Sequence, residues 1–203
     1  MWDNRYATDE YRFGTQPNRF LEECAPLLTP GAKMPLPAVR VLSLGEGEGR
    51  NAVYLAALGF DVTAVDGSSV GLAKARSLAQ QRGVTLTTIT ADLNDYPIPP
   101  AAWDCIINFF CHVPEPERVP LHRRVIEGLK PGGAYILEVF SPQQPQFGTG
   151  GPTSRDLLMS ADDARRELAG LDLRIVREVI RHRDDDDPST PLVAVTQIMG
   201  IRP

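Results

Sequence analysis

A glycine loop placed directly after an apolar run most constrains what this chain can fold into. Residues 41–44 read Val-Leu-Ser-Leu, and residues 45–49 follow as Gly-Glu-Gly-Glu-Gly. Glycines at alternate positions allow a sharp turn from a strand into a helix, and a ligand can approach the main chain because no Cβ intervenes. β-rich and helical runs then alternate along the chain, which is typical of a parallel sheet covered on both faces. The pattern predicts an α/β fold with a nucleotide-type ligand at its first turn.

The charge of this loop favours one kind of ligand. A dinucleotide-binding loop has the spacing G-x-G-x-x-G and offers bare N–H groups to a pyrophosphate. Here the spacing is G-x-G-x-G, and Glu46 and Glu48 would lie beside the phosphates at a cost on the order of 1 kcal/mol each. S-adenosylmethionine carries a sulfonium and an ammonium instead of phosphates, and nearby carboxylates stabilise such cations. The loop therefore predicts S-adenosylmethionine as the cofactor.

Acidic residues at the ends of the next two β-rich runs fit the same ligand. Asp66 ends the run 60–66, and a carboxylate at the tip of a second strand can accept hydrogen bonds from a ribose diol. Asp92 and Leu93 end the run 86–93, a pairing suited to the amino group and the ring face of an adenine. Together with the loop, these residues predict a binding site for an adenosyl group.

Through the loop 45–49, Asp66, Asp92 and the turn at 129–133 (Leu-Lys-Pro-Gly-Gly), the chain resembles the class I S-adenosylmethionine-dependent methyltransferases. Residues 49–66 and 11–21 look more narrowly like the tellurite-resistance and thiopurine methyltransferase-like branch. That family often has an acidic residue near the end of the first strand. This chain has Ser43 there, so Glu46 and Glu48 would supply the negative charge.

The resemblance implies a Rossmann-like α/β fold. Its sheet would be seven-stranded and mostly parallel, with an antiparallel C-terminal strand and helices on both faces. Residues 1–203 would form one methyltransferase domain, with 1–38 as an N-terminal lid or helical extension and 39–203 as the catalytic core. The predicted cofactor-binding residues are Gly45, Glu46, Gly47, Glu48, Gly49, Arg50, Asn51, Asp66, Gly67, Ser68, Asp92, Leu93 and Phe109.

His112 is the candidate catalytic residue. It follows the β-rich run 103–110, whose tip would face the transferred methyl group in this fold. An imidazole near its usual pKa of about 6.5 can remove a proton or orient an acceptor at neutral pH. A purely structural role for His112 stays open. No metal site is predicted, because Cys24, Cys105 and Cys111 lack ligand spacing.

Two segments outside the alternation are expected on the substrate side. The N-terminal segment carries Trp2, Tyr11 and Phe13, and the Pro/Gln/Gly-rich segment 141–153 carries Phe147. These rings are expected to form a lid. The alternatives are that the N-terminal rings dock a helix on the sheet and that 141–153 is an ordinary surface loop.

The remaining pattern predicts helices over 51–58, 69–82, 120–129 and 161–168, and a hairpin from the runs 173–181 and 192–201. His122 and His182 are expected to be solvated. The acidic run 184–187 is expected to be a solvated turn before Pro188 and not a metal site.

Composition bounds the function. The chain has 203 residues, 42% of them hydrophobic, and a net charge of −5. It is long enough for one buried core, and it lacks the basic balance of a general nucleic-acid binder. No signal or membrane segment is evident, so a cytoplasmic monomer or weak dimer is expected.

The most consistent function is methyl transfer by in-line displacement to a small-molecule substrate, whether a chalcogen oxyanion, a thiol or another small metabolite. Two alternatives stay open. One is a protein that binds the cofactor without turnover, and the other is an NAD(P)-dependent oxidoreductase.

Overall fold

The computed structural model describes residues 2–28, 39–184 and 187–203. The described residues form a seven-stranded sheet in the order β3-β2-β1-β4-β5-β7-β6. Strands β1 to β5 are parallel, and β7 pairs antiparallel with both β5 and β6. The predicted fold class is confirmed. The strands are β1 (Arg40–Leu44), β2 (Asp61–Asp66), β3 (Thr87–Thr90), β4 (Trp103–Phe109), β5 (Leu129–Phe140), β6 (Asp172–His182) and β7 (Leu192–Ile201).

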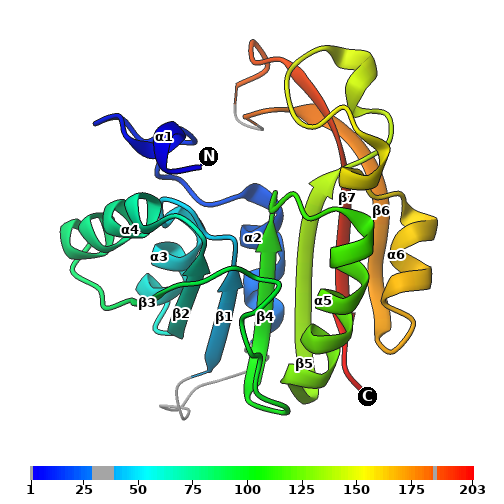
Figure 1. Ribbon diagram of the computed structural model, residues 1–203, viewed down its shortest axis with the longest axis horizontal. Helices are drawn as coiled ribbons and strands as arrows, with labels where there is room; N and C mark the ends of the chain where they lie inside the picture. The colour runs from blue at the N-terminus through cyan, green and yellow to red at the C-terminus, as the bar shows by residue number, and fades with distance from the viewer. Residues whose placement is uncertain (1, 29–38, 185–186) are drawn as a thin grey trace.

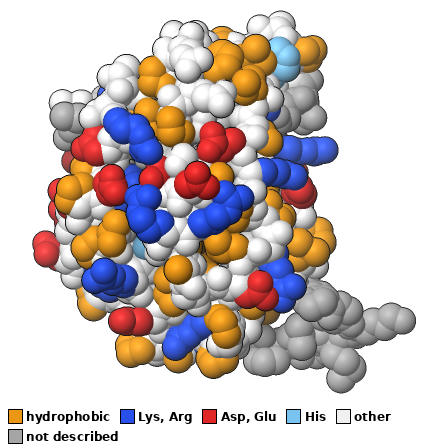
Figure 2. Space-filling view, turned by 90° about the vertical axis from the view of Figure 1, so that its right-hand side faces the viewer, with side chains coloured by type: hydrophobic (Ala, Val, Ile, Leu, Met, Phe, Trp, Pro, Cys, Tyr) orange, Lys and Arg blue, Asp and Glu red, His pale blue; other side chains and the backbone are white. Residues whose placement is uncertain are grey.

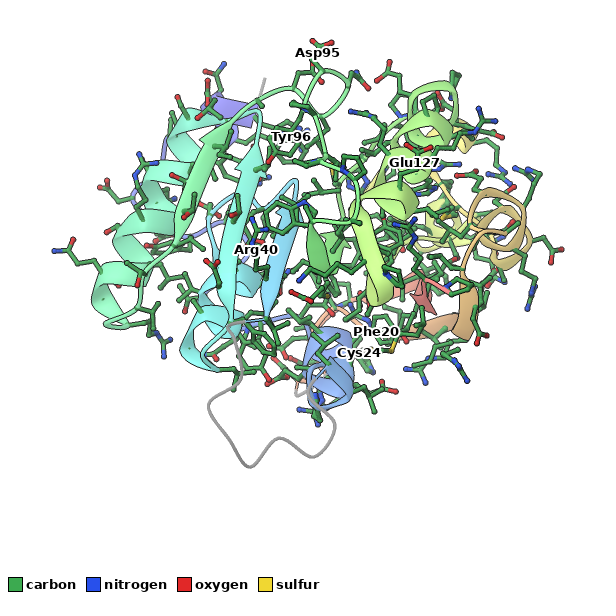
Figure 3. All side chains as sticks on the ribbon, turned by 90° about the horizontal axis from the view of Figure 1, so that it is seen from below. Phe20, Cys24, Arg40, Asp95, Tyr96 and Glu127 are labelled. Atoms are coloured by element: carbon green, nitrogen blue, oxygen red, sulfur yellow. The ribbon has the colours of Figure 1, made fainter. Side chains whose placement is uncertain are left out.

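Helices cover both faces of the sheet (Figure 1). The α-helices are α1 (Trp2–Tyr6), α2 (Arg19–Cys24), α3 (Arg50–Ala57), α4 (Ser69–Gln81), α5 (Glu115–Gly128) and α6 (Ala161–Glu167). Three short 3₁₀ helices accompany them: η1 (Ala25–Leu28), η2 (Gln144–Phe147) and η3 (Arg155–Leu157). Figure 3, seen from the amino-terminal ends of the parallel strands, shows Phe20 and Cys24 of α2 on one side of the sheet and Glu127 of α5 on the other.

Alternate residues of β1 belong to different cores. Val41 packs in the cluster that contains Phe20 of α2 and Leu55 of α3, whereas Leu42 packs in the cluster that contains Val125 of α5. A strand whose two faces are both covered by helices must be apolar at successive positions. The run 41–44 is therefore largely apolar because β1 lies inside the sheet, between β2 and β4.

Helix boundaries follow local chemistry. The Ser68 hydroxyl accepts a hydrogen bond from the Gly71 amide (3.1 Å) and caps α4. Helix α6 begins with a capping box between Ser160 and Asp163. Both helices begin close to where the sequence predicts them.

Helix α5 begins earlier than predicted. The sequence predicts 120–129 with a proline in the first turn, but α5 starts at Glu115 and the first-turn proline is Pro116. Pro120 lies inside the helix, where it lacks the amide that would bond to the preceding turn. Packing of Leu121 and Val125 against the sheet outweighs this local loss.

The turn at 129–133 lies within β5, which begins at Leu129. The register with β4 is irregular there, between Trp103 and Cys105, and Gly132 adopts a φ of 79°. The turn is therefore a local irregularity of β5.

The carboxyl ends of the parallel strands meet at one end of the molecule. Figure 1 shows α1 and the segment that joins β5 to α6 at this end, on opposite sides. Part of the predicted extension 1–38 lies outside the described residues, while 2–28 contains α1, α2 and η1. We call residues 2–28 the N-terminal strap.

Candidate functional site

A cavity of about 1420 Å³ lies at the carboxyl ends of the parallel strands. Most of the residues that the sequence predicts for the site line this cavity. Those that line it are Trp2, Phe13, Gly45, Glu46, Arg50, Asn51, Asp66, Gly67, Asp92, Leu93, Phe109 and His112. Six others do not line it: Gly47, Glu48, Gly49, Ser68, Tyr11 and Phe147.

The glycines of the loop are needed because the loop packs tightly against its own chain. Gly45, Gly47 and Gly49 have φ values of 65°, 65° and 97°. A Cβ on Gly45 would lie 2.5 Å from Cys111 Sγ, and one on Gly47 would lie 2.6 Å from Tyr6 Oη. Only glycine combines this backbone with such close neighbours. Gly47 and Gly49 thus shape the loop without facing the cavity.

Glu46 occupies the amino end of α3. Its Oε1 accepts hydrogen bonds from the amides of Asn51 (3.1 Å) and Ala52 (3.0 Å), and its Oε2 accepts one from the Ser43 hydroxyl. Burial raises the pKa of Glu46, while these hydrogen bonds oppose the rise. The first free amides of a helix are where a phosphate would bind. In this site the Glu46 carboxylate already accepts hydrogen bonds from two of these amides.

Glu48 does not contribute its charge to the cavity, contrary to the prediction. Its Oε1 lies 2.5 Å from Lys74 Nζ, and its Oε2 accepts a hydrogen bond from the Arg12 amide (2.8 Å). The side chain is buried between α4 and the N-terminal strap. The sequence could not reveal this because Lys74 and Arg12 are distant along the chain.

Asp66 is held in place by backbone amides. Its Oδ2 accepts a hydrogen bond from Gly47 (2.8 Å) and its Oδ1 from Ser68 (2.7 Å). Burial raises the pKa of Asp66, opposed by these two hydrogen bonds. A carboxylate has about four acceptor positions, so two more donors can bind. Asp66 can therefore accept hydrogen bonds from the two hydroxyls of a diol in the cavity.

The turn with Asp92 and Leu93 is fixed from α5. Arg124 donates to the carbonyls of Leu93 and Tyr96 (both 2.7 Å), and Asp92 Oδ1 accepts from the Asn94 amide (2.9 Å). Sequence reasoning did not identify Arg124 as a supporting residue. The Arg124 guanidinium thus fixes the main chain at Leu93, and the Leu93 side chain lines the cavity.

Three rings form what we call the aromatic wall: Phe110, His112 and Phe140. The ring centroids of Phe110 and Phe140 are 4.9 Å apart, and His112 stacks on Phe140 at 5.5 Å with an interplanar angle of 17°. All three side chains line the cavity. Phe110 and Phe140 were not predicted as site residues. Phe140 ends β5, and only the pairing of β4 with β5 brings it beside Phe110.

His112 departs from its expected ionisation. Burial, followed by the nearby Arg5, lowers the pKa of His112 to about 4. The ring is therefore neutral at pH 7 and is a weaker base than the usual imidazole. Its Nδ1 has no hydrogen-bond partner among the described residues.

The N-terminal strap is fastened over the glycine loop. Lys74 Nζ donates to the carbonyls of Thr8 (2.9 Å) and Glu10 (2.6 Å), besides its ion pair with Glu48. Tyr6 lies against the loop, and burial raises the pKa of its hydroxyl. Trp2, Arg5 and Tyr6 all line the cavity. Tyr6 was not predicted as a site residue, and its place at the loop depends on the fold.

Two predicted lid residues lie elsewhere. Tyr11 packs beside Val53 and Leu78, and its hydroxyl donates to the Lys74 carbonyl (3.2 Å). Phe147 belongs to η2 and does not line the cavity. Tyr11 thus anchors the strap to α3 and α4, while Phe13 does reach the cavity.

A buried carboxylate joins the strap to the sheet. Glu138 of β5 accepts hydrogen bonds from Asn18 (3.1 Å), Arg181 (2.5 Å) and Gln197 (2.7 Å). The main-chain amide of Asn18 also donates to Asn51 Oδ1 (2.9 Å), whereas the bond to Glu138 comes from the Asn18 side chain. Asn51, predicted to bind the cofactor, therefore uses its side-chain oxygen to hold the strap.

His122 is buried, and the prediction that it is solvated is wrong. Its Nδ1 lies 3.0 Å from Glu167, which Arg118 also binds through two hydrogen bonds. Burial opposes ionisation of Glu167, but the hydrogen bonds from His122 and Arg118 outweigh it and lower the pKa to about 2. Arg118 also donates to the carbonyls of Val113 and Asp156, so the network supports the loop that carries His112.

Other expectations concern the surface. Residues 185 and 186 of the acidic run lie outside the described residues, and His182 is half-buried with Nδ1 2.7 Å from the Thr190 carbonyl. Over residues 2–28, 39–184 and 187–203, no three His, Cys, Asp or Glu side chains gather as metal ligands would. None of the helices in those residues has the length and hydropathy of a membrane span.

The face that carries α6 and β6 is not a basic patch. Figure 2 shows acidic and basic side chains interspersed on it. Exposed pairs include Arg165 with Asp162 (2.8 Å) and Arg174 with Asp172 (2.7 Å).

The sequence is similar to those of known methyltransferases. Residues 41–133 match the family model described as a methyltransferase domain. A relative in Bacillus subtilis, the uncharacterized methyltransferase YbaJ, is 28% identical over 116 residues. The match covers 57% of this chain and 46% of YbaJ, so the chain spans about half the length of this curated relative.

Solved structures share the fold over nearly the whole chain. The structure of TehB from Haemophilus influenzae has a TM-score of 0.72 at 16% identity and covers 100% of this chain and 66% of that one. A structure from a study of the conversion of a disulfide bond into a thioacetal group during echinomycin biosynthesis has a TM-score of 0.74 at 20% identity. It covers 99% of this chain and 90% of that chain. At these identities the likeness establishes the Rossmann-like fold.

Proposed function

We propose that this chain, whose residues 41–133 match the model of a methyltransferase domain, uses S-adenosylmethionine to transfer a methyl group to a small-molecule acceptor. The acceptor would be a chalcogen oxyanion, a thiol or another small metabolite. Residues 49–66 and 11–21 carry the narrower resemblance to the tellurite-resistance and thiopurine methyltransferase-like branch. The aromatic wall lies at the tip of β4, where the acceptor is expected to bind.

The observation that carries the proposal is the position of Glu46. Its Oε1 holds two amides at the amino end of α3, so a pyrophosphate would meet a carboxylate where it needs free N–H groups. This disfavours NAD(P) and leaves room for a cofactor without phosphate. The residues present therefore fit S-adenosylmethionine.

The chain's residues divide the work of holding this cofactor. Asp66 would accept the ribose hydroxyls, because its two oxygens are aimed by the Gly47 and Ser68 amides. Leu93 and Asp92 would bind the adenine, and Arg50 lines the same cavity. When bound, S-adenosylmethionine would supply a methyl group on a sulfonium: an acceptor lone pair would bond to the methyl carbon, the bond from that carbon to sulfur would break, and S-adenosylhomocysteine, a neutral thioether, would leave.

The protein contributes orientation and exclusion of water. Positive charge is lost along this reaction, so a carboxylate that stabilised the sulfonium strongly would oppose it. We propose that the N-terminal strap acts as a lid, since Trp2, Arg5 and Tyr6 face the cavity. His112 would orient the acceptor, because its low pKa makes it a weak base. Approach geometry in a dry site can contribute several kcal/mol.

The test is calorimetric titration of the whole chain with S-adenosylmethionine, S-adenosylhomocysteine and NADH. We expect the two adenosyl ligands to bind and NADH not to bind. Binding of NADH alone, or of none of the three, would contradict the proposal. Formation of S-adenosylhomocysteine with any acceptor would then separate an enzyme from a protein that binds the cofactor without turnover.

A pH profile separates two kinds of acceptor. An acceptor that must lose a proton to a base gives a rate that falls below the pKa of that base, whereas an anionic acceptor does not. With His112 as the base, the fall would come near its pKa of about 4. Rates measured from about pH 3 to pH 8 span that fall and therefore report on the acceptor class.

A further inference from the structure

Gly71 of α4 is a glycine that its own backbone does not require. Its φ is not positive, whereas the φ values of Gly47 and Gly49 are. With an ordinary helical backbone, glycine costs about 0.5–1 kcal/mol relative to alanine. A Cβ on Gly71 would lie 2.9 Å from Tyr6 Cδ2 and 3.1 Å from the Gly47 carbonyl oxygen. The missing side chain therefore leaves space for a ring of the N-terminal strap.

Gly47 completes this space from the glycine loop. A Cβ on Gly47 would lie 2.6 Å from Tyr6 Oη and 3.2 Å from Tyr6 Cζ. We call the space between Gly47 and Gly71 the tyrosine slot. Trp2 stacks on the Tyr6 ring with centroids 5.6 Å apart and an interplanar angle of 24°, and Tyr6 is only 6% exposed. The slot and the stack together fix the direction of the phenol.

The Tyr6 hydroxyl has no hydrogen-bond partner among the described residues. Unlike His112 Nδ1, its oxygen is not fully enclosed, and Tyr6 lines the cavity together with Glu46 and Asp66. Burial, followed by the negative charge of Asp66, raises the pKa of this hydroxyl, so it stays protonated at neutral pH. A phenol that is nearly buried usually has a hydrogen-bond partner. The cavity is the place from which that partner would come.

Ser68 joins this end of the strap to Asp66. Its amide donates to Asp66 Oδ1 (2.7 Å), and its hydroxyl donates to Asp3 in α1. The same hydroxyl accepts a hydrogen bond from the Gly71 amide (3.1 Å). Helix α1, which carries Tyr6, thereby packs against α4 (Figure 1). A ligand that bonds to Asp66 lies next to the part of the strap that carries the phenol.

We propose that Tyr6 is a cofactor-binding residue: the tyrosine slot seats its ring, and its hydroxyl donates a hydrogen bond to S-adenosylmethionine from beside Asp66. This inference rests on the proposed function, which supplies the cofactor. It makes the N-terminal strap a part of the cofactor site and not only a lid above it. Because coupling between two binding events is reciprocal, bound cofactor holds the strap and the docked strap holds the cofactor.

Calorimetric titration of the whole chain with S-adenosylhomocysteine tests the hydroxyl. Tyr6→Phe keeps the ring in the slot and removes only the donor, so the dissociation constant should rise about threefold to tenfold. Tyr11→Phe is the matched control, because it removes a strap hydroxyl that donates to the Lys74 carbonyl (3.2 Å) outside the cavity. It should leave the dissociation constant unchanged. A rise of less than about twofold in Tyr6→Phe, or an equal rise in both variants, would overturn the inference.

Limited proteolysis tests the coupling without any turnover. Saturating S-adenosylhomocysteine should slow cleavage within residues 2–18 of the parent chain by about threefold to tenfold, which is the reciprocal of the effect on binding. Tyr6→Phe should be cleaved like the parent chain when no ligand is present, because its ring stays seated. It should then gain little protection from the ligand. A parent strap that the ligand does not protect, or equal protection in Tyr6→Phe, would overturn the inference.

Gly71→Ala tests the slot. Its methyl group would displace the Tyr6 ring, so we expect faster cleavage of the strap without ligand and S-adenosylhomocysteine binding about threefold to tenfold weaker. Ser77→Ala, at an exposed position of the same helix, is the control and should change neither. Thermal unfolding shows whether both variants fold. A folded Gly71→Ala with the cleavage and binding of the parent chain would mean that the slot does not seat the ring.

The parent chain separates failure of this inference from failure of the proposed function. If the parent binds S-adenosylhomocysteine and Tyr6→Phe binds it equally well, the proposed function stands and the role of Tyr6 is wrong. If the parent does not bind S-adenosylhomocysteine, the proposed function is wrong and the inference is wrong with it.

Discussion

The two sides of the cavity are built in different ways. The glycine-loop side comes from one stretch of chain, because the loop, α3 and Asp66 all lie within residues 45–66, and its polar groups are bonded to one another. The aromatic-wall side is assembled from the ends of β4 and β5 and leaves His112 Nδ1 unpartnered among the described residues. The first side is therefore held by hydrogen bonds among neighbouring residues, whereas the second depends on the pairing of β4 with β5.

The N-terminal strap joins the two sides. Tyr6 and Lys74 fasten it to the glycine loop and α4, and Asn18 fastens it to Glu138 of β5. A change on one side can therefore reach the other through the strap.

The largest effect is expected in the glycine loop, residues 45–49. Gly49→Ala combines a φ of 97° with a Cβ only 2.7 Å from Ala75, so strain and overpacking should lower the free energy of unfolding by about 2–5 kcal/mol. Gly83→Ala is the matched control, with a φ of 68° and no atom within 4 Å of its Cβ, and it should cost about 1–2 kcal/mol. Urea unfolding of both variants measures the difference. Equal losses would show that the loop is not tightly packed.

The next effect concerns the support of the aromatic-wall side. The pKa of Glu167 is lowered to about 2, so its stabilising contribution is present above its usual pKa of about 4.5 and is lost as the pH falls towards 2. The loss should reach about 3 kcal/mol in the free energy of unfolding. Glu167→Gln should flatten this pH dependence, while Asp162→Asn, at an exposed pair, should not. A parent profile that stays flat from pH 4.5 to pH 2 would contradict the assignment.

Release of the strap should give a smaller effect. Lys74→Met leaves Glu48 buried without its cation and frees three strap carbonyls, those of Tyr6, Thr8 and Glu10, which should cost about 1–3 kcal/mol. Limited proteolysis should then cut residues 2–18 faster than in the parent chain. Arg76→Met, on the same helix but bonded to Thr88, is the control and should leave the rate unchanged. If the strap stays protected in Lys74→Met, other contacts hold it.

The smallest effect separates the two carboxylates of the loop. Glu46→Gln should weaken S-adenosylmethionine binding by about tenfold, because Glu46 lines the cavity. Glu48→Gln should weaken it by about threefold or less, because Glu48 faces Lys74 and the strap. Dissociation constants from calorimetry make the comparison. Equal effects would mean that both charges act on the ligand, as the sequence alone predicts.

Sequence reasoning brought to the cavity those residues whose positions depend on nearby parts of the chain. The glycine loop, Asp66, Asp92 and Leu93 could be placed because each ends a recognisable β-rich run, and such ends meet at one edge of a parallel sheet. It failed for Glu48, Tyr11 and His122, whose partners Lys74, Val53 and Glu167 come from other elements. It also placed the start of α5 too late, because the packing of α5 on the sheet overrides Pro120.

The sequence by itself determined the order of strands and helices, the glycine loop and the acidic residues that end the strands. Those features depend on backbone preferences and hydrophobic periodicity, which are local properties of a chain. Only the tertiary structure decided that Lys74 neutralises Glu48 and that Phe110, His112 and Phe140 form one wall. Charges and rings act over distances in space, and separation along the chain does not set those distances.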